Sequence, residues 1–328
     1  MPKKSYKIKL QQALRGRWGL LGLGLLVVFL AYLSLRTGAY DIQAHEEGWQ
    51  MLWITRFPRT LALMLSGTAM SMSGLVMQLL SQNRFVEPTT TGTIEWAGLG
   101  LILCYLLFPS PSLFLRMGFA IMAAFVGTLV FFYFMRNIRL KSGLLVPLIG
   151  IMLGAVVSAI STFIGLAFNM TQSLEIWFTG SFASIQQGRY EYLWLIILVT
   201  LAIYFLADRL TIAGLGRDVA TNLGVDYQKV SLLGTALVAL AVGIVASVVG
   251  YLPFLGLIVP NTISLFRGDD VRSNLIWVSL LGMALIMACD ILSRWLIAPF
   301  ELPVSVILGT LGSFVFISLL LYQRRHKT

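Results

Sequence analysis

The sequence predicts an all-α, polytopic membrane protein, and its composition, its apolar runs and its charge distribution support this fold class. Of 328 residues, 58% are hydrophobic and 12% are charged, and the mean hydropathy is +0.84. A soluble domain is about 25% charged. Apolar runs of about 20 residues, each long enough to cross a bilayer, account for about ten helices. The remainder is too short for a soluble domain of ordinary size, so we treat 1–328 as one transmembrane domain.

Basic residues predict how these helices are oriented. All but six of the 24 lysines and arginines fall in the termini or in loops expected on one side of the membrane. The six exceptions are Arg36, Arg56, Arg59, Arg116, Arg189 and Arg294. Because Lys and Arg accumulate in cytoplasmic loops, both termini are expected in the cytoplasm, with tails at 1–17 and 323–328. The net charge of +10 then reflects topology and gives no support to nucleic-acid binding.

The first span is expected at Trp18–Leu35, a run too long for a signal-peptide core and without a small-residue cleavage site. Further helices are expected near residues 60–83, 94–108, 113–135, 143–168, 191–207, 230–250, 274–296 and 304–322. Residues 169–190 are too polar to span and are interpreted as an interfacial helix, with Trp177 and Phe178 at the membrane boundary. Residues 209–229 are expected to form a polar cytoplasmic segment.

The segment 251–267 is the least regular of the apolar runs, and it either spans the membrane or re-enters it. Pro260 is expected to interrupt a helix there at membrane depth. The backbone groups freed by such an interruption need partners within the protein, so we expect this region to be buried or to line a cavity.

The helix expected from residue 60 carries a face of small residues. Gly67, Ser71, Gly74 and Gln78 are spaced i, i+4, i+7 and i+11, so they lie on one side of the helix. Such a face lets neighbouring helices approach closely, or it lines a pathway with Gln78 near its inner end. The spacing leaves both interpretations open.

Four motifs carry a resemblance to a known family. Arg56-Phe57-Pro58-Arg59 precedes the small-residue helix, and Asn83-Arg84-Phe85-Val86-Glu87-Pro88 follows it. Later the chain reads Ala-Cys-Asp-Ile-Leu-Ser-Arg to Arg294, and then Glu-Leu-Pro-Val from Glu301. The pattern resembles the permease family of the iron-siderophore and cobalamin ABC importers, which are type II importers. Where that family usually has Asn-Pro-Leu-Ala, this chain has Asn83-Arg84-Phe85-Val86, a departure that resembles the catecholate-siderophore branch.

The resemblance implies a permease that carries a ferric siderophore across the bacterial cytoplasmic membrane, with haem or cobalamin as alternative cargo. Two such chains, identical or paired with a close paralogue, would enclose one pathway, with two ATPase subunits and an extracytoplasmic binding protein as partners. The chain contains no Gly-Lys dipeptide and so no Walker A loop, and it is not expected to be an enzyme or to hold a cofactor. ATP–Mg would bind the partner ATPase. The opposite directions of the second and seventh helices favour an inverted repeat of helices 2–5 and 7–10.

The resemblance also implies roles for individual residues. It implies docking of the binding protein on Arg56, Arg59 and Arg294, a gate at Asn83 and Phe85, and coupling to the ATPase through Arg217, Asp218, Ala220, Leu223, Gly224 and Val225. Asp290 and Arg294 are four residues apart on one helix, a spacing that allows an ion pair. Such a pair would neutralise two costly intramembrane charges.

Acidic residues within apolar runs leave a competing hypothesis open. Glu95 lies one turn into its helix, where it is either a helix-start charge or a residue of the pathway. A stand-alone, proton-coupled transporter would use Glu95, Asp290 or Glu301 as a relay. Cys104 and Cys289 lie in apolar runs outside any C-x-x-C pair, so we expect buried thiols and no metal site.

Overall fold

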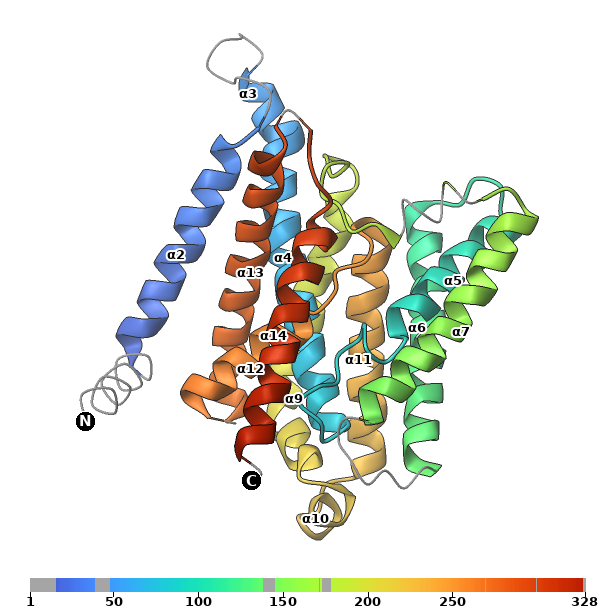
Figure 1. Ribbon diagram of the computed structural model, residues 1–328, viewed down its shortest axis with the longest axis vertical. Helices are drawn as coiled ribbons and strands as arrows, with labels where there is room; N and C mark the ends of the chain where they lie inside the picture. The colour runs from blue at the N-terminus through green and yellow to red at the C-terminus, as the bar shows by residue number, and fades with distance from the viewer. Residues whose placement is uncertain are drawn as a thin grey trace.

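The computed structural model describes residues 16–38, 48–137, 145–170, 172, 178–268, 270–298 and 300–326. Most of the predicted N-terminal tail lies outside these residues, as do residues 171 and 173–177 of the segment 169–190, Trp177 included. The described residues 179–189 form turns and irregular structure, so the interfacial helix expected there is wrong over this stretch. Within the described residues, every regular element is helical (Figure 1). Each membrane-embedded helix expected from the sequence has a counterpart in the described part of the chain.

The elements follow one another as α2 (Arg17–Arg36), α3 (Gly48–Met51), η1 (Leu52–Arg56), α4 (Phe57–Leu80), α5 (Thr93–Leu107), α6 (Leu113–Asn137), α7 (Leu145–Ala167), η2 (Tyr190–Trp194), α9 (Leu195–Gly214), α10 (Arg217–Asn222), α11 (Tyr227–Val248), α12 (Leu255–Arg267), α13 (Val271–Leu296) and α14 (Val304–His326). Seven helical stretches among the described residues are long and apolar enough to cross a membrane. Three apolar helices are shorter: α5, α12 and the part of α14 from Val304 to Ser318.

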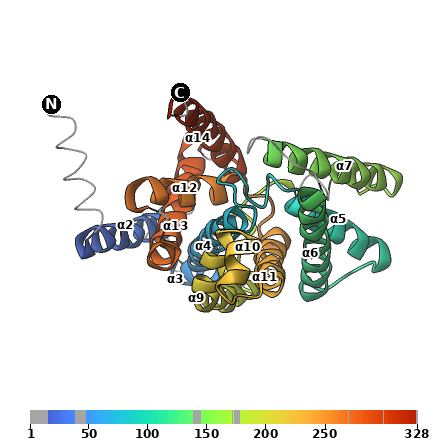
Figure 2. The same ribbon diagram turned by 90° about the horizontal axis from the view of Figure 1, so that it is seen from below.

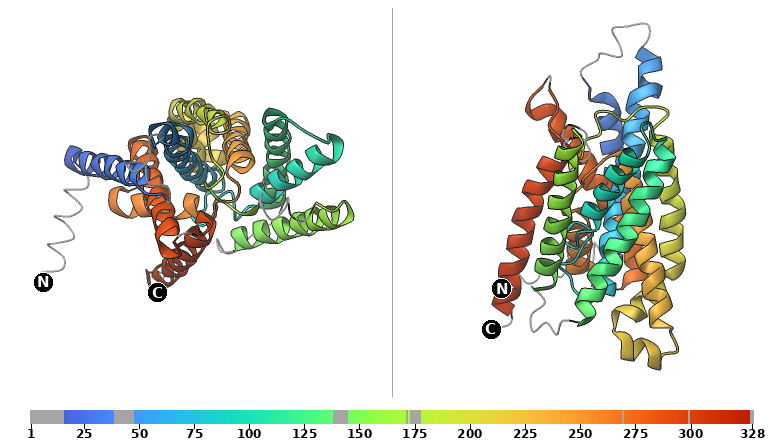
Figure 3. Two further views of the ribbon diagram at one scale, coloured as in Figure 1. Left: turned by 90° about the horizontal axis from the view of Figure 1, so that it is seen from above. Right: turned by 90° about the vertical axis from the view of Figure 1, so that its right-hand side faces the viewer.

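The long helices run between two ends of the bundle, which we name after the short helices that mark them (Figure 1). The α3 end carries α3 and the start of α4, and the α10 end carries α10, the start of α2 and the end of α14. Seen along the bundle, α2 and α7 lie at opposite edges with α4 between them (Figure 2 and Figure 3). α4 packs against α9, α11, α12 and α13, and most of its side chains are buried.

The small face of α4 explains this central position. A Cβ atom added to Gly67 would lie 2.6 Å from the carbonyl oxygen of Gly282 in α13, and one added to Gly74 would overlap Gly256 in α12. Ser71 is fully buried and lies against Gly282. Close helix packing is therefore the function of Gly67, Ser71 and Gly74.

The irregular region around Pro260 differs from the expectation. Pro260 lies inside α12, and the interruption falls before that helix, ending at Phe254 with φ 61°. Thus the prediction that Pro260 itself interrupts a helix is wrong. Proline removes the N–H that would bond the carbonyl four residues earlier, and here Gln78 Nε2 donates to that Gly256 oxygen at 3.1 Å instead. The Gly256 carbonyl that Pro260 leaves without a helical bond therefore has a hydrogen-bond partner within the protein, as expected from the sequence.

Two helices of the bundle, α12 and α5, are short. With 13 residues, α12 is about 20 Å long, and with 15 residues α5 is about 22 Å long. Both are shorter than the hydrocarbon core of about 30 Å. Each follows an irregular segment, 81–92 before α5 and 249–254 before α12. These two segments meet, and they position most of the residues considered next.

Candidate functional site

An ion-pair network closes the α3 end. Arg59 Nη2 donates to Asp290 Oδ1 at 2.7 Å, and Arg59 Nη1 donates to Glu301 Oε2 at 2.8 Å. Asp290 is fully buried and also pairs with Arg294, at the i, i+4 spacing noted in the sequence. One buried carboxylate therefore lies between two guanidinium groups, which provide the compensation that a buried charge needs.

Arg294 extends the network to α2. It donates to the carbonyl oxygens of Ser34 at 3.1 Å and Thr37 at 2.7 Å, and to Ser34 Oγ at 2.9 Å. Its side chain is 5% exposed. Arg56, at the start of α4, donates to the carbonyl oxygens of Leu35 at 3.0 Å and Arg36 at 3.1 Å. All three arginines expected to dock a partner thus have partners within the chain, and Arg294 is buried.

Glu87 joins the two irregular segments. Its carboxylate is fully buried, accepts a hydrogen bond from the backbone N–H of Phe254 at 2.9 Å, and accepts another from the hydroxyl of Thr89. It therefore lies at the N-terminus of α12, where a negative charge is favoured by unpaired N–H groups and by the helix dipole. The sequence presented Glu87 only as the acid of a motif, and its spacing gave no indication of this contact.

The expected gate residues lie in the same segment. Asn83 Oδ1 accepts from the N–H of Phe85 at 2.9 Å. Phe85 is buried, and its ring meets that of Phe316 in α14 edge to face, with 5.7 Å between centroids. Asn261 Nδ2 donates to the carbonyl oxygen of Arg84 at 2.8 Å. The segment is thereby fastened to both α12 and α14.

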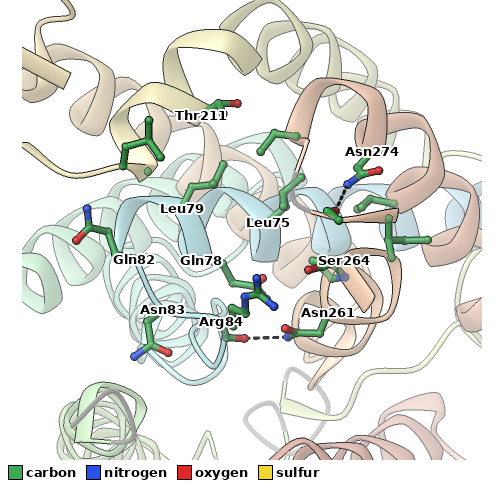
Figure 4. Close-up of a pocket in the computed structure, with 17 residues that line it drawn as sticks. Leu75, Gln78, Leu79, Gln82, Asn83, Arg84, Thr211, Asn261, Ser264 and Asn274 are labelled. Carbon is green, nitrogen blue, oxygen red and sulfur yellow. Dashed lines mark hydrogen bonds between the residues drawn. The ribbon is translucent and has the colours of Figure 1, made fainter. Parts of the chain in front are cut away.

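A cavity of about 290 Å³, lined by apolar side chains and by several amides, lies beside this segment (Figure 4). Gln78, Asn83 and Arg84 line it from α4 and the following segment, and Asn261 and Asn274 line it from α12 and α13. Figure 4 shows the amide of Asn261 bonded to the Arg84 carbonyl at its margin. The structure thus brings Gln78 and Asn83 together, whereas Phe85 packs on α14 and Glu95 lines a different cavity.

The expected coupling residues surround α10. Arg217, Asp218, Leu223 and Gly224 are exposed, and Ala220 is buried. Val225 is half-buried against the core, and its N–H donates to Ala220 O at 2.9 Å. These contacts hold α10 on its own chain and leave the Leu223 side chain 60% exposed.

The segment after α10 ends in a helix cap. Asp226 Oδ1 accepts from the N–H of Lys229 at 3.1 Å and so caps α11. This hydrogen bond lowers the pKa of Asp226 below its ordinary value.

The acids that a proton relay would require are separated. Asp290 and Glu301 share Arg59 at the α3 end, while Glu95 makes no hydrogen bond to either among the described residues. Cys104 and Cys289 are free and buried. Within the described part of the chain, no group of three or more His, Cys, Asp or Glu side chains could hold a metal ion.

Comparison with known proteins decides the family. The model of the FecCD transport family matches residues 21–322. The chain belongs to the FecCD transport family. It is a multi-pass membrane permease subunit of a type II ABC importer, which confirms the family and the subunit type expected from the motifs.

Two curated relatives and one solved structure extend this result. The chain is 64% identical over 303 residues to the petrobactin import system permease protein FatD of Bacillus anthracis, covering 92% of this chain and 91% of the relative. It is 37% identical over 308 residues to the petrobactin import system permease protein YclN of Bacillus subtilis, covering 92% and 98%. A protein assigned to the metal-chelate type of ABC transporters, solved in an inward-facing conformation, matches with a TM-score of 0.79 and 26% identity over 93% of this chain and 98% of that one.

Proposed function

We propose that this FecCD-family permease imports a ferric siderophore of the petrobactin type across the bacterial cytoplasmic membrane, driven by a separate ATPase. The 64% identity to a petrobactin permease over nine-tenths of both chains carries the proposal. The second relative, at 37% identity, bears the same cargo in its name. Neither name mentions haem or cobalamin, and a permease of Citrobacter koseri named for vitamin B12 import matches at the lower identity of 33%.

Two permease chains, identical or close paralogues, would enclose the pathway, with the α10 end in the cytoplasm. The excess of basic residues in loops that connect helices at that end supports this orientation. An inverted repeat of helices 2–5 and 7–10, which correspond to α4–α7 and α11–α14, is supported by α5 and α12. Both are short and follow an irregular segment, the pattern expected at corresponding places in two transporter halves.

The ATPase would bind α10 and the residues around it. Leu215, Val219 and Leu223 are 59%, 44% and 60% exposed there. Exposed apolar side chains on a polar segment favour a protein partner that covers them. The segment 209–229 would pass closure of the ATPase to α9 and α11, between which it lies.

The binding protein would dock at the α3 end, through Arg56 and Arg59. Guanidinium groups hold a partner's carboxylates in a bidentate geometry. Arg294 is too buried to meet a partner directly, so we propose that it holds Asp290, and through Asp290 positions Arg59. Arg59 already bonds Glu301, which is 31% exposed and accessible to exchange with a partner carboxylate.

Reconstitution tests the proposal. Vesicles containing the permease and its ATPase, with the binding protein added at the outer face, should take up ferric petrobactin when ATP is supplied to the ATPase side. Matched vesicles with a hydrolysis-deficient ATPase should not. Uptake driven by a proton gradient in the absence of any ATPase would instead support the stand-alone transporter, and uptake of haem or cobalamin alone would overturn the cargo.

A further inference from the structure

A second cavity, of about 380 Å³, lies between α5, α7 and the segment before α12. It is lined by Glu95, Ile151, Gly154, Ala155, Ser158, Phe178 and Tyr251. The lining is unusual for the interior of a membrane protein because one carboxyl group faces two aromatic side chains and a hydroxyl. α7, which contributes to this lining, lies at the edge of the bundle (Figure 2).

Glu95 presents an unused acceptor to this cavity. Its Oε2 is covered from solvent and receives no hydrogen bond from any described residue. No described Lys or Arg forms an ion pair with Glu95. A covered carboxylate oxygen that receives no hydrogen bond is costly, so this acceptor favours a donor that enters the cavity.

Two glycines make room for this carboxyl group. A Cβ atom added to Gly154 would lie 3.3 Å from Glu95 Oε2, and one added to Gly92 would lie 3.1 Å from the Cα of Gly154. Gly92 has φ 80°, a conformation that other residues rarely adopt. Any larger residue at 154 would press on the carboxyl group and reduce the cavity beside it.

The position of the cavity connects it with transport. Tyr251 belongs to the irregular segment before α12, which Glu87 fastens at Phe254. Glu95 lies in the first turn of α5, directly after the other irregular segment. In secondary transporters, discontinuous helices form substrate sites near the middle of the membrane.

We propose that Glu95, with Tyr251 and Phe178, forms a subsite on the pathway for a positively charged amine group of the iron chelate. A carboxylate provides the counter-charge and the hydrogen-bond acceptor, and aromatic faces attract cations. This inference rests on the proposed function, because it takes the cargo to be a ferric siderophore. It adds that Glu95 determines which siderophores are carried.

The test compares two synthetic ferric catecholate chelates that differ only in one group, a primary ammonium in one and its neutral N-acetyl derivative in the other. Uptake of each is measured as kcat/KM in vesicles with the complete importer. The wild-type ratio should favour the ammonium chelate, and Glu95→Gln should reduce that ratio by about tenfold, the effect of one charge-assisted hydrogen bond. Any preference of the binding protein cancels because it is common to both importers.

Glu191→Gln is the matched control, since it neutralises an exposed carboxylate that accepts a hydrogen bond from Gly188 outside the cavity. It should leave the ratio unchanged. A Glu95→Gln importer that keeps the wild-type ratio would overturn the subsite, as would a wild-type importer that transports neither chelate or both equally. Ferric petrobactin uptake in the same vesicles is scored separately, so the proposed function stands or fails on its own measurement.

Discussion

The two ends of the bundle satisfy their buried polar groups by different means. At the α3 end, Arg59, Asp290, Arg294 and Glu301 join three parts of the chain through charges. At the segment 81–92, nearer the α10 end, amides and hydroxyls bond mainly to backbone groups, and Glu87 is the only buried carboxylate among its described residues.

This difference indicates where each region can move. Removing one member of a buried ion pair strands the other charge, so such a network holds a single arrangement. A neutral hydrogen bond contributes only about 1 kcal/mol and can exchange partners. We therefore expect substitutions within the ion-pair network of Arg59, Asp290, Arg294 and Glu301 to act mainly on folding, and those in the segment 81–92 to affect transport as well.

Arg59→Glu should have the largest effect on stability. It places a third carboxyl group beside Asp290 and Glu301 and leaves Arg294 as the one described partner of Asp290. We expect a loss of about 3–5 kcal/mol in the free energy of unfolding, measured as a lower unfolding temperature of the purified permease in detergent. Wild-type thermal stability in this variant would show that the network contributes little.

Glu87→Ala should have the second-largest effect on stability. It removes the acceptor for the Phe254 N–H and for the Thr89 hydroxyl in a fully buried site. We expect a loss of about 1–3 kcal/mol together with reduced uptake. Glu87→Gln retains one acceptor oxygen and is the matched control, with a smaller loss. Equal effects of the two substitutions would argue against the capping role.

How far the sequence predicted these two regions depends on the distance between partners along the chain. The helices and the Asp290–Arg294 pair follow from local spacing. The contacts of Arg59 with Asp290 and of Glu87 with Phe254 join residues 231 and 167 positions apart. Such contacts depend on how helices pack, which periodicity does not encode. Pro260 illustrates the same limit, because the partner of the Gly256 carbonyl that it leaves free is Gln78, which comes from α4.

Arg56→Glu separates docking from folding at the α3 end. Its described hydrogen bonds go to carbonyl groups at the end of α2, so we expect a smaller loss in the free energy of unfolding than for Arg59→Glu. Association with the binding protein should slow by about tenfold at low salt and less at high salt. Arg36→Glu is the control, an exposed arginine that stacks on Tyr32. Unchanged association of the Arg56→Glu variant at low salt would refute its docking role.

Leu223→Asp should have the smallest effect on stability and the clearest effect on assembly. The side chain is 60% exposed, so the isolated permease should unfold at its wild-type temperature. In the complex, the new charge would be buried against the ATPase without a partner, at a cost of several kcal/mol. The ATPase should then fail to co-purify, or should hydrolyse ATP without uptake.

Val225→Asp provides the contrast, because Val225 packs against the core of its own chain and its loss should lower the unfolding temperature. Normal assembly and uptake in the Leu223→Asp variant would mean that the ATPase binds elsewhere.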